Sequence, residues 1–88
     1  MITNSRAAIE VQGSHAHHVF NPAGVLFEIG CFAQAPGCSP VGSPSTEFTW
    51  FAGHSWRIVV CASCGQHLGW MFTREAVFFG LISNRLSD

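Results

Sequence analysis

The chain has 88 residues, of which 48% are hydrophobic and only 10% are charged, and its formal net charge is −1. A chain of this length folds as one small domain, and this hydrophobic content excludes a disordered tail. The near-neutral charge provides no basic surface for nucleic acid. Residues 1–6 lack the apolar core of a signal peptide, and no 18-residue apolar run spans a membrane. We therefore expect a protein of the reducing cytoplasm.

A period of two in the hydrophobic pattern predicts strands along most of the chain. Apolar and polar or small residues alternate over 9–12, 25–31 and 68–72, and the segments 55–60 and 76–82 are rich in β-branched or aromatic residues. Between residues 33 and 46, three Pro, two Gly and three Ser predict a long loop, which in a compact domain usually serves a site. No segment has a sustained helical period. The pattern predicts an all-β fold of two small antiparallel sheets.

Cys61 and Cys64 are separated by two residues and followed by Gly65, which is the spacing of a zinc knuckle. A structural zinc takes four ligands, so this pair is half a site. The candidates for the missing positions are an upstream segment or the residues His15, His17, His18, Cys31 and Cys38. Two alternatives remain open: both cysteines are small buried hydrophobic residues, and the histidine run at 15–18 is a solvated strand edge or turn.

All three tryptophans, Trp50, Trp56 and Trp70, lie in a 21-residue stretch that also holds the Cys-x-x-C. Such a concentration predicts an aromatic-walled pocket for a flat, compact ligand, with ordinary core packing as the alternative. His54 and His67 have no neighbouring Ser, Cys or carboxylate in a pattern that activates a nucleophile. We expect surface or pocket-rim roles for these two histidines.

An ordered set of short motifs carries a more specific signal. The set consists of Asn-Pro-Ala-Gly at 21–24, Pro-Ser-Thr-Glu at 44–47, the three tryptophans, the Cys-x-x-C and Phe-Gly-Leu at 79–81. Together these motifs resemble the thalidomide-binding domain of cereblon, also called the CULT domain, over residues 2–86. The resemblance implies one domain over 1–88, similar in length to bacterial single-domain members. It also implies a β-tent, in which a zinc held by four cysteines pins two antiparallel sheets at the apex.

The resemblance further implies ligand binding without catalysis. Family members hold a cyclic imide of the glutarimide or thalidomide type in a cage of three tryptophans. Cyclic imides left at protein C-termini when Asn or Gln side chains cyclise are the candidate natural ligands, with pyrimidine nucleosides as weaker ones. We expect a monomer without a ubiquitin-ligase adaptor, because neither a Lon-like domain nor an adaptor-binding region is visible. The implied ligand-binding residues are Asn21, Pro22, Glu47, Phe48, Thr49, Trp50, Trp56, Trp70 and Phe72.

Two departures from the family pattern affect these expectations. Animal cereblons carry a His at the position of Phe48. The ring of Phe48, unlike that of His, cannot donate a hydrogen bond. The first Cys-x-x-C of the family lies upstream of the segment that begins at Met1, so the chain is expected to be truncated at its N-terminus. Zinc bound by Cys61 and Cys64 alone is therefore expected to have an incomplete site.

Two other classes share parts of this pattern. Methionine-sulfoxide reductases of the B type resemble the β-tent, but they need a reactive cysteine late in the chain, and none follows Cys64. A module similar to Yippee-like proteins would use the tryptophan cage as a protein-binding patch. We expect no enzyme activity, and titration with a glutarimide separates the remaining two classes.

Overall fold

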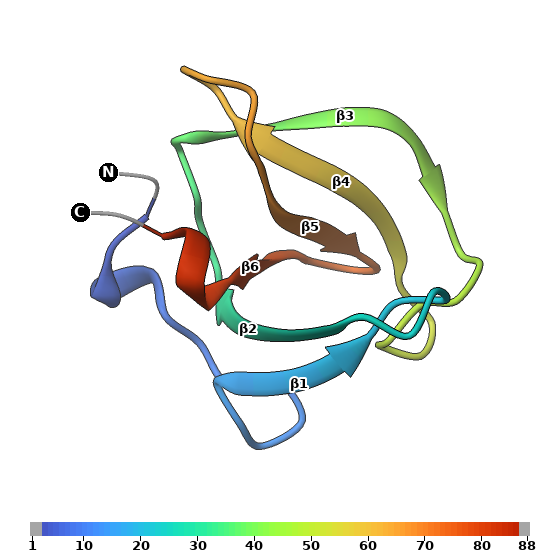
Figure 1. Ribbon diagram of the computed structural model, residues 1–88. Coiled ribbons are helices and arrows are strands. Elements are labelled where there is room, and N and C mark those ends of the chain that lie inside the picture. The colour runs from blue at the N-terminus through green and yellow to red at the C-terminus, as the bar shows by residue number, and fades with distance from the viewer. Residues whose placement is uncertain (1–2, 87–88) are drawn as a thin grey trace.

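The computed structural model describes residues 3–86, which form one antiparallel sheet of six strands in the order β1-β2-β6-β5-β4-β3 (Figure 1). The all-β prediction is confirmed, although the strands join in one sheet rather than two. The predicted domain bounds of 1–88 include four terminal residues that lie outside the described range. None of the helices in residues 3–86 is long and apolar enough to cross a membrane. The strands are β1 (Ala16–Phe20), β2 (Leu26–Phe32), β3 (Cys38–Ser45), β4 (Ser55–Cys61), β5 (His67–Thr73) and β6 (Val77–Ile82), with 3-10 turns at Ser5–Ala7 and Ser83–Arg85.

The sheet is continuous because its first hairpin pairs with its last strand. Strands β3 to β6 form a meander, β1 and β2 form a hairpin, and β2 pairs with β6 through Ile29 opposite Ile82. Figure 1 shows the sheet curving so that the turn after β1 approaches the connection between β3 and β4. The site described below lies where these two connections meet.

Two local predictions were wrong. The predicted loop over 33–46 contains strand β3, which includes Pro40 and Pro44. Strand β3 is an edge strand, where a residue without an N–H costs no ladder hydrogen bond on the solvent side. Residues 9–12 do not form the predicted strand, because Val11 makes only an isolated bridge to Ser14 and the other isolated bridge, from Ala8 to Phe32, lies just before this range. Gln12, with a φ of 55°, begins a tight turn that ends the extended segment.

The core consists of two clusters on opposite faces of the sheet, and a β-bulge in β5 changes the cluster that Leu68 joins. Val59 of β4 pairs with Gly69 and Val60 pairs with His67, so Leu68 has no partner on β4. This extra residue shifts the alternation of β5 by one position, so side chains before and after the bulge that are two residues apart point to opposite faces of the sheet. Leu68 therefore packs in the smaller cluster, whereas Trp70 packs in the larger one. The period-two pattern alone had predicted that both side chains share a face.

Candidate functional site

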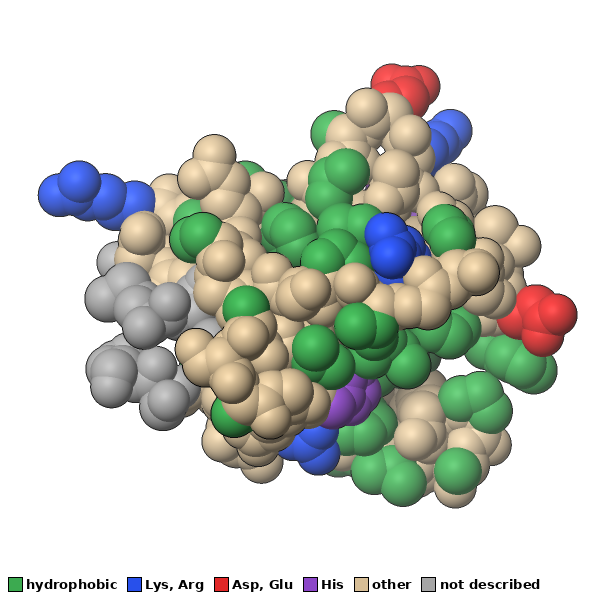
Figure 2. Space-filling view, turned by 90° about the horizontal axis from the view of Figure 1, so that it is seen from above, with side chains coloured by type: hydrophobic (Ala, Val, Ile, Leu, Met, Phe, Trp, Pro, Cys, Tyr) green, Lys and Arg blue, Asp and Glu red, His purple; other side chains and the backbone are tan. Residues whose placement is uncertain are grey.

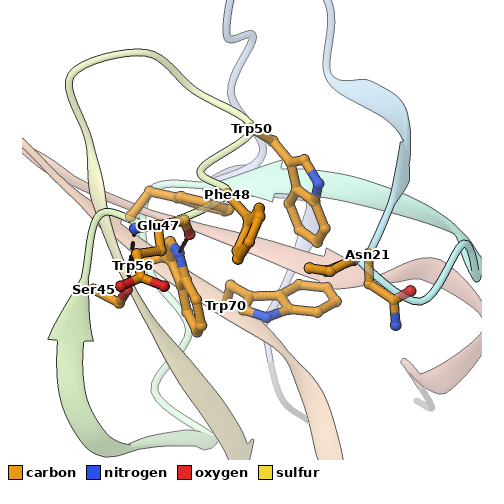
Figure 3. A pocket seen from close by; sticks show the side chains of 9 residues that line it. Asn21, Ser45, Glu47, Phe48, Trp50, Trp56 and Trp70 are labelled. Atoms are coloured by element: carbon orange, nitrogen blue, oxygen red, sulfur yellow. Dashed lines mark hydrogen bonds between the residues drawn. The ribbon is translucent and has the colours of Figure 1, made fainter.

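One cavity of about 330 Å³ collects most of the residues named by the sequence. Figure 3 shows the indoles around it, with Trp70 between Trp56 and Trp50 and the ring of Phe48 beside them. The lining residues come from the turn after β1, the end of β3, the β3–β4 connection, β4 and β5. They are Asn21, Pro22, Ser45, Glu47, Phe48, Trp50, Trp56, Trp70 and Phe72.

Strands β4 and β5 provide the base of the cavity. Trp70 and Phe72 are two residues apart on β5 and are only 8% and 1% exposed. Trp56 of β4 stands directly opposite Phe72 in the ladder, so both side chains lie on the same face of the sheet. Gly80 of β6 leaves room for this base, because a Cβ there would lie 2.9 Å from the Phe72 ring.

Trp50 forms a second wall from the β3–β4 connection. Its ring meets that of Trp70 edge to face, with centroids 4.6 Å apart and an interplanar angle of 85°. Its Nε1–H donates to the carbonyl oxygen of Phe20 at 2.8 Å. This hydrogen bond joins the β3–β4 connection to the end of β1. Trp50 is therefore positioned by segments from both edges of the sheet, since β1 and β3 are its two edge strands.

The third wall is fixed by a hydrogen bond from its indole. Trp56 Nε1–H donates to the carbonyl oxygen of Glu47 at 2.7 Å, and the Glu47 N–H donates to Ser45 Oγ at 3.1 Å (Figure 3). The next residue, Phe48, has a φ of 56° and a side chain that is 71% exposed. A left-handed backbone at a non-glycine residue is uncommon and often accompanies function.

The backbone after Glu47 has free polar groups. Within residues 3–86, the backbone N–H and C=O groups of residues 48–50 make no hydrogen bond. Thr49 uses its hydroxyl to donate to the Phe51 carbonyl oxygen at 3.2 Å and does not line the cavity. Unpaired backbone groups beside a pocket are available to a ligand.

Asn21 and Pro22 close the remaining side. The N–H of Val25 donates to Asn21 Oδ1 at 2.9 Å, and the N–H of Gly24 donates to the Asn21 carbonyl oxygen at 2.9 Å. The Asn21 side chain is thus engaged in holding its own turn. Gly24, with a φ of 83°, supplies the left-handed residue that this turn requires.

The cavity thus contains every predicted ligand-binding residue except Thr49. Ser45 also lines the cavity and was not predicted, although it stands in the Pro-Ser-Thr-Glu motif and pairs with Trp56 across β3 and β4. His54 and His67 do not line the cavity. His54 packs against Phe51 and Phe78, and His67 packs edge-on against Trp70, with ring centroids 4.9 Å apart.

The predicted zinc knuckle forms a tight turn, which we call the cysteine turn (residues 61–65). The N–H of Gly65 donates to the Cys61 carbonyl oxygen at 2.8 Å, and Gly65 has the left-handed φ of 78° expected at this point. Backbone hydrogen bonds from Cys64 and Ser63 lower the pKa of the Cys61 thiol, and the Cys64 side chain adds to this effect. The turn therefore favours a thiolate at Cys61, while Cys64 is exposed.

The candidates for the other metal positions are scattered. No group of three or more His, Cys, Asp or Glu side chains in residues 3–86 could hold a metal ion. His15 and His17 are hydrogen-bonded to backbone oxygens, and His18 Nε2 lies 3.1 Å from a Glu28 oxygen. Burial raises the pKa of the Cys31 thiol to about 11. Only two donors of a structural zinc site are therefore assembled in this part of the chain.

Cys38 lies beside the turn without joining it. It is the cross-strand partner of Cys61, and burial, followed by the neighbouring Cys61, raises the pKa of its thiol to about 11. The histidine run also has an ordinary explanation, since β1 begins at Ala16 and is an edge strand. Figure 2 shows no gathering of Arg side chains among the described residues on the face it presents.

The chain is similar to curated cereblon proteins, whereas no protein-family model matches it. It is 44% identical over 71 residues to the protein cereblon of Drosophila grimshawi, covering 69% of this chain and 10% of that protein. It is 41% identical over 70 residues to the protein cereblon of Xenopus tropicalis, covering 80% of this chain and 15% of that protein. The matched region is thus a small part of each relative. These identities and the all-β fold show that the chain belongs to the family of cereblon-like domains, the CULT domains.

Proposed function

We propose that this chain is a binding module for cyclic imides of the glutarimide or thalidomide type and performs no reaction on them. The observation that carries the proposal is the cavity of about 330 Å³ walled by the three-tryptophan cage (Trp50, Trp56 and Trp70). Small-molecule pockets measure roughly 300–1,000 Å³, so this one suits a single compact ring. A flat ring gains stacking and apolar burial from indoles on several sides.

The edge of an imide needs one acceptor between two donors. The free backbone groups of residues 48–50 supply both kinds beside the cavity. The carbonyl of Glu47 already accepts from Trp56, and the ring of Phe48 has no polar atom. Recognition of the imide edge therefore relies on the backbone, and specificity relies on the size of the cage.

The same cavity accepts an imide as a free small molecule or at the end of a protein chain. Cyclised Asn or Gln residues at protein C-termini present this ring, and the ring of Phe48 is exposed at the cavity. We propose that the module works as a monomer in the cytoplasm. Pyrimidine nucleosides carry a similar imide edge, but their attached sugar makes them poorer ligands for a cavity of this size.

The lining of the cavity favours binding over a reductase reaction. No cysteine is among the residues that line it, so the described pocket offers no thiol nucleophile. A protein-binding patch of the Yippee-like kind would not saturate with a small imide. One titration therefore separates the proposal from both alternatives.

The test is a fluorescence titration of the chain with glutarimide compounds. We expect micromolar dissociation constants, about −8 kcal/mol, and a change in Trp emission because all three tryptophans line the cavity. Trp56→Ala should abolish binding while circular dichroism stays native. Phe20→Ala is the matched control, because this ring is 62% exposed and lies outside the cavity, and its backbone carbonyl still accepts from Trp50.

An N-methylated glutarimide tests recognition of the imide edge. Methylation removes the ligand N–H and should weaken binding by at least tenfold, since an acceptor is left without its donor. Equal affinity for the two compounds would show that the cavity recognises only an apolar ring. Retained affinity in Trp56→Ala would remove the cage from the site.

A further inference from the structure

Cys38 and Cys61 face each other across β3 and β4. The two residues are Cα partners in the ladder. The N–H of Cys61 donates away from β3, to Gln66 at 2.8 Å, whereas the flanking Ala62 N–H donates to the Gly37 carbonyl oxygen at 2.9 Å. The cysteines therefore occupy a non-hydrogen-bonded position of the antiparallel pair, where opposing side chains approach most closely.

The Cα spacing typical of this position falls within the range that disulfides span. Opposing Cα atoms at non-hydrogen-bonded positions are about 4.5 Å apart, and disulfides join Cα atoms about 4.4–6.8 Å apart. Both side chains pack against the smaller core cluster, so they lie on the same face of the sheet. Both thiols are free in the reduced chain.

We propose that Cys38 and Cys61 form a cross-strand disulfide when the chain meets a small-molecule disulfide. One cysteine thiolate attacks the oxidant, forming a mixed disulfide and releasing one small-molecule thiolate. The second cysteine loses its proton to solvent and attacks the protein sulfur of the mixed disulfide. The S–S bond between the strands forms and the second small-molecule thiolate leaves. The protein loses two electrons and two protons, and the oxidant becomes two thiols.

The other two cysteines are weaker partners. Cys31 is fully buried in the larger cluster, away from the smaller cluster that Cys38 and Cys61 contact. Cys64 is close to Cys61, but a bond between them would close a loop of only residues 61–64. A disulfide stabilises a fold more when it closes a longer loop in the unfolded chain. The bond that closes 38–61 is therefore expected to stabilise the fold more than the bond between Cys61 and Cys64.

The disulfide would enclose much of the candidate pocket. The segment 38–61 supplies five of the nine residues that line the cavity. A bond at its ends holds β3 in register with β4 and shortens the free connection between them. We expect the oxidised chain to unfold at a higher temperature. This proposal is independent of any ligand of the cavity.

Peptide mapping after equilibration with oxidised and reduced glutathione tests the proposal. The chain has no Lys, and trypsin cleavage at Arg6, Arg57 and Arg74 separates peptide 7–57 from peptide 58–74. A bond between Cys38 and Cys61 joins the two peptides, whereas a bond between Cys61 and Cys64 stays inside the second one. We expect the joined pair from the original chain and from Cys64→Ser, but not from Cys38→Ser.

Several results would overturn the assignment. The bond inside peptide 58–74 could dominate in the original chain, or Cys64→Ser could remain reduced under the same conditions. A joined pair that persists in Cys38→Ser would assign the bond to Cys31. Cys64 is exposed, so Cys64→Ser is expected to fold. Its oxidised form should melt several degrees above its reduced form, and an equal or lower melting temperature would exclude the stabilising bond.

Discussion

The aromatic cavity and the cysteine turn lie in the same small domain but are assembled differently. The cavity draws side chains from strands and connections that are far apart in the sequence, and two of them, Trp70 and Phe72, belong to the buried core. The cysteine turn is local and holds two thiols, with no cluster of three donors in residues 3–86. An apolar pocket forms as part of core packing, whereas a metal site depends on the number of donors within bonding distance.

The largest predicted effect concerns the overlap of pocket and core. Trp70→Ala should destabilise the domain by about 3–5 kcal/mol, the usual cost of truncating a buried aromatic residue. Trp70 is 8% exposed and contacts Trp50, Phe27 and His67 edge to face. Urea unfolding followed by far-ultraviolet circular dichroism measures the change.

The matched control lies in the other region. Cys64→Ala removes an exposed side chain of the cysteine turn and should change the free energy of unfolding by less than about 0.5 kcal/mol. Comparable losses in the two variants would mean that the turn contributes as much stability as the pocket. The contrast between the two regions would then be wrong.

Most strands with period-two patterns could be predicted from the sequence, and the exceptions have physical reasons. Strand β3 was missed because its Pro and Gly residues disfavour most strands, but the penalty is small on an edge. The face of Leu68 was mistaken because a one-residue bulge is set by pairing with β4 and leaves no local signal. Both errors concern tertiary pairing.

The candidate site was easier to predict than its details. The three tryptophans and the motif at 44–47 named almost every residue that lines the cavity. Ser45 was missed and Thr49 was included because adjacent residues of a motif carry the same signal, whichever of them faces the cavity. Which residues of the motif face the cavity depends on the local backbone, such as strand β3 at Ser45 and the left-handed φ at Phe48, and the motif alone carries no signal for it.

A second prediction examines how the cavity holds its ligand. If backbone groups of residues 48–50 bind the imide, Phe48→His should change affinity by no more than roughly 1.5 kcal/mol, the scale of one neutral hydrogen bond. Phe48 is 71% exposed, so the fold should tolerate the change. Isothermal titration with a glutarimide measures the effect, and a loss greater than a hundredfold would assign the binding to the ring itself.

A third, smaller effect concerns His67, which lies between the two regions at the start of β5. Burial lowers the pKa of His67, and the positive charge of Arg85 lowers it further. A hydrogen bond to the Gly69 backbone raises the pKa and offsets part of this effect. The folded state therefore favours the neutral imidazole of His67. The contribution of this neutral side chain to the stability of the fold is complete above the unfolded pKa of about 6.5. It is lost as the pH falls through that value towards the lower folded pKa.

Thermal unfolding between pH 7.5 and 5 measures this dependence. His67→Gln should flatten the loss of melting temperature on acidification. His54→Gln is the matched control, since His54 also packs edge-on against aromatic rings. An identical pH profile for His67→Gln and the original chain would show that His67 does not titrate with folding.

The smallest expected effect concerns metal removal, because two thiolates leave two positions of a tetrahedral zinc to water or to borrowed ligands. We expect substoichiometric zinc in the purified 88-residue chain, released by EDTA, with no measurable change in melting temperature. Elemental analysis before and after chelation gives the zinc content, and Cys61→Ser provides a control without the favoured thiolate. One zinc per chain that survives EDTA would require additional ligands, with Cys38 the nearest by strand register. In that case the cysteine turn would belong to a complete metal site, assembled like the cavity from several parts of the chain. Disulfide formation at Cys61 would then compete directly with metal binding.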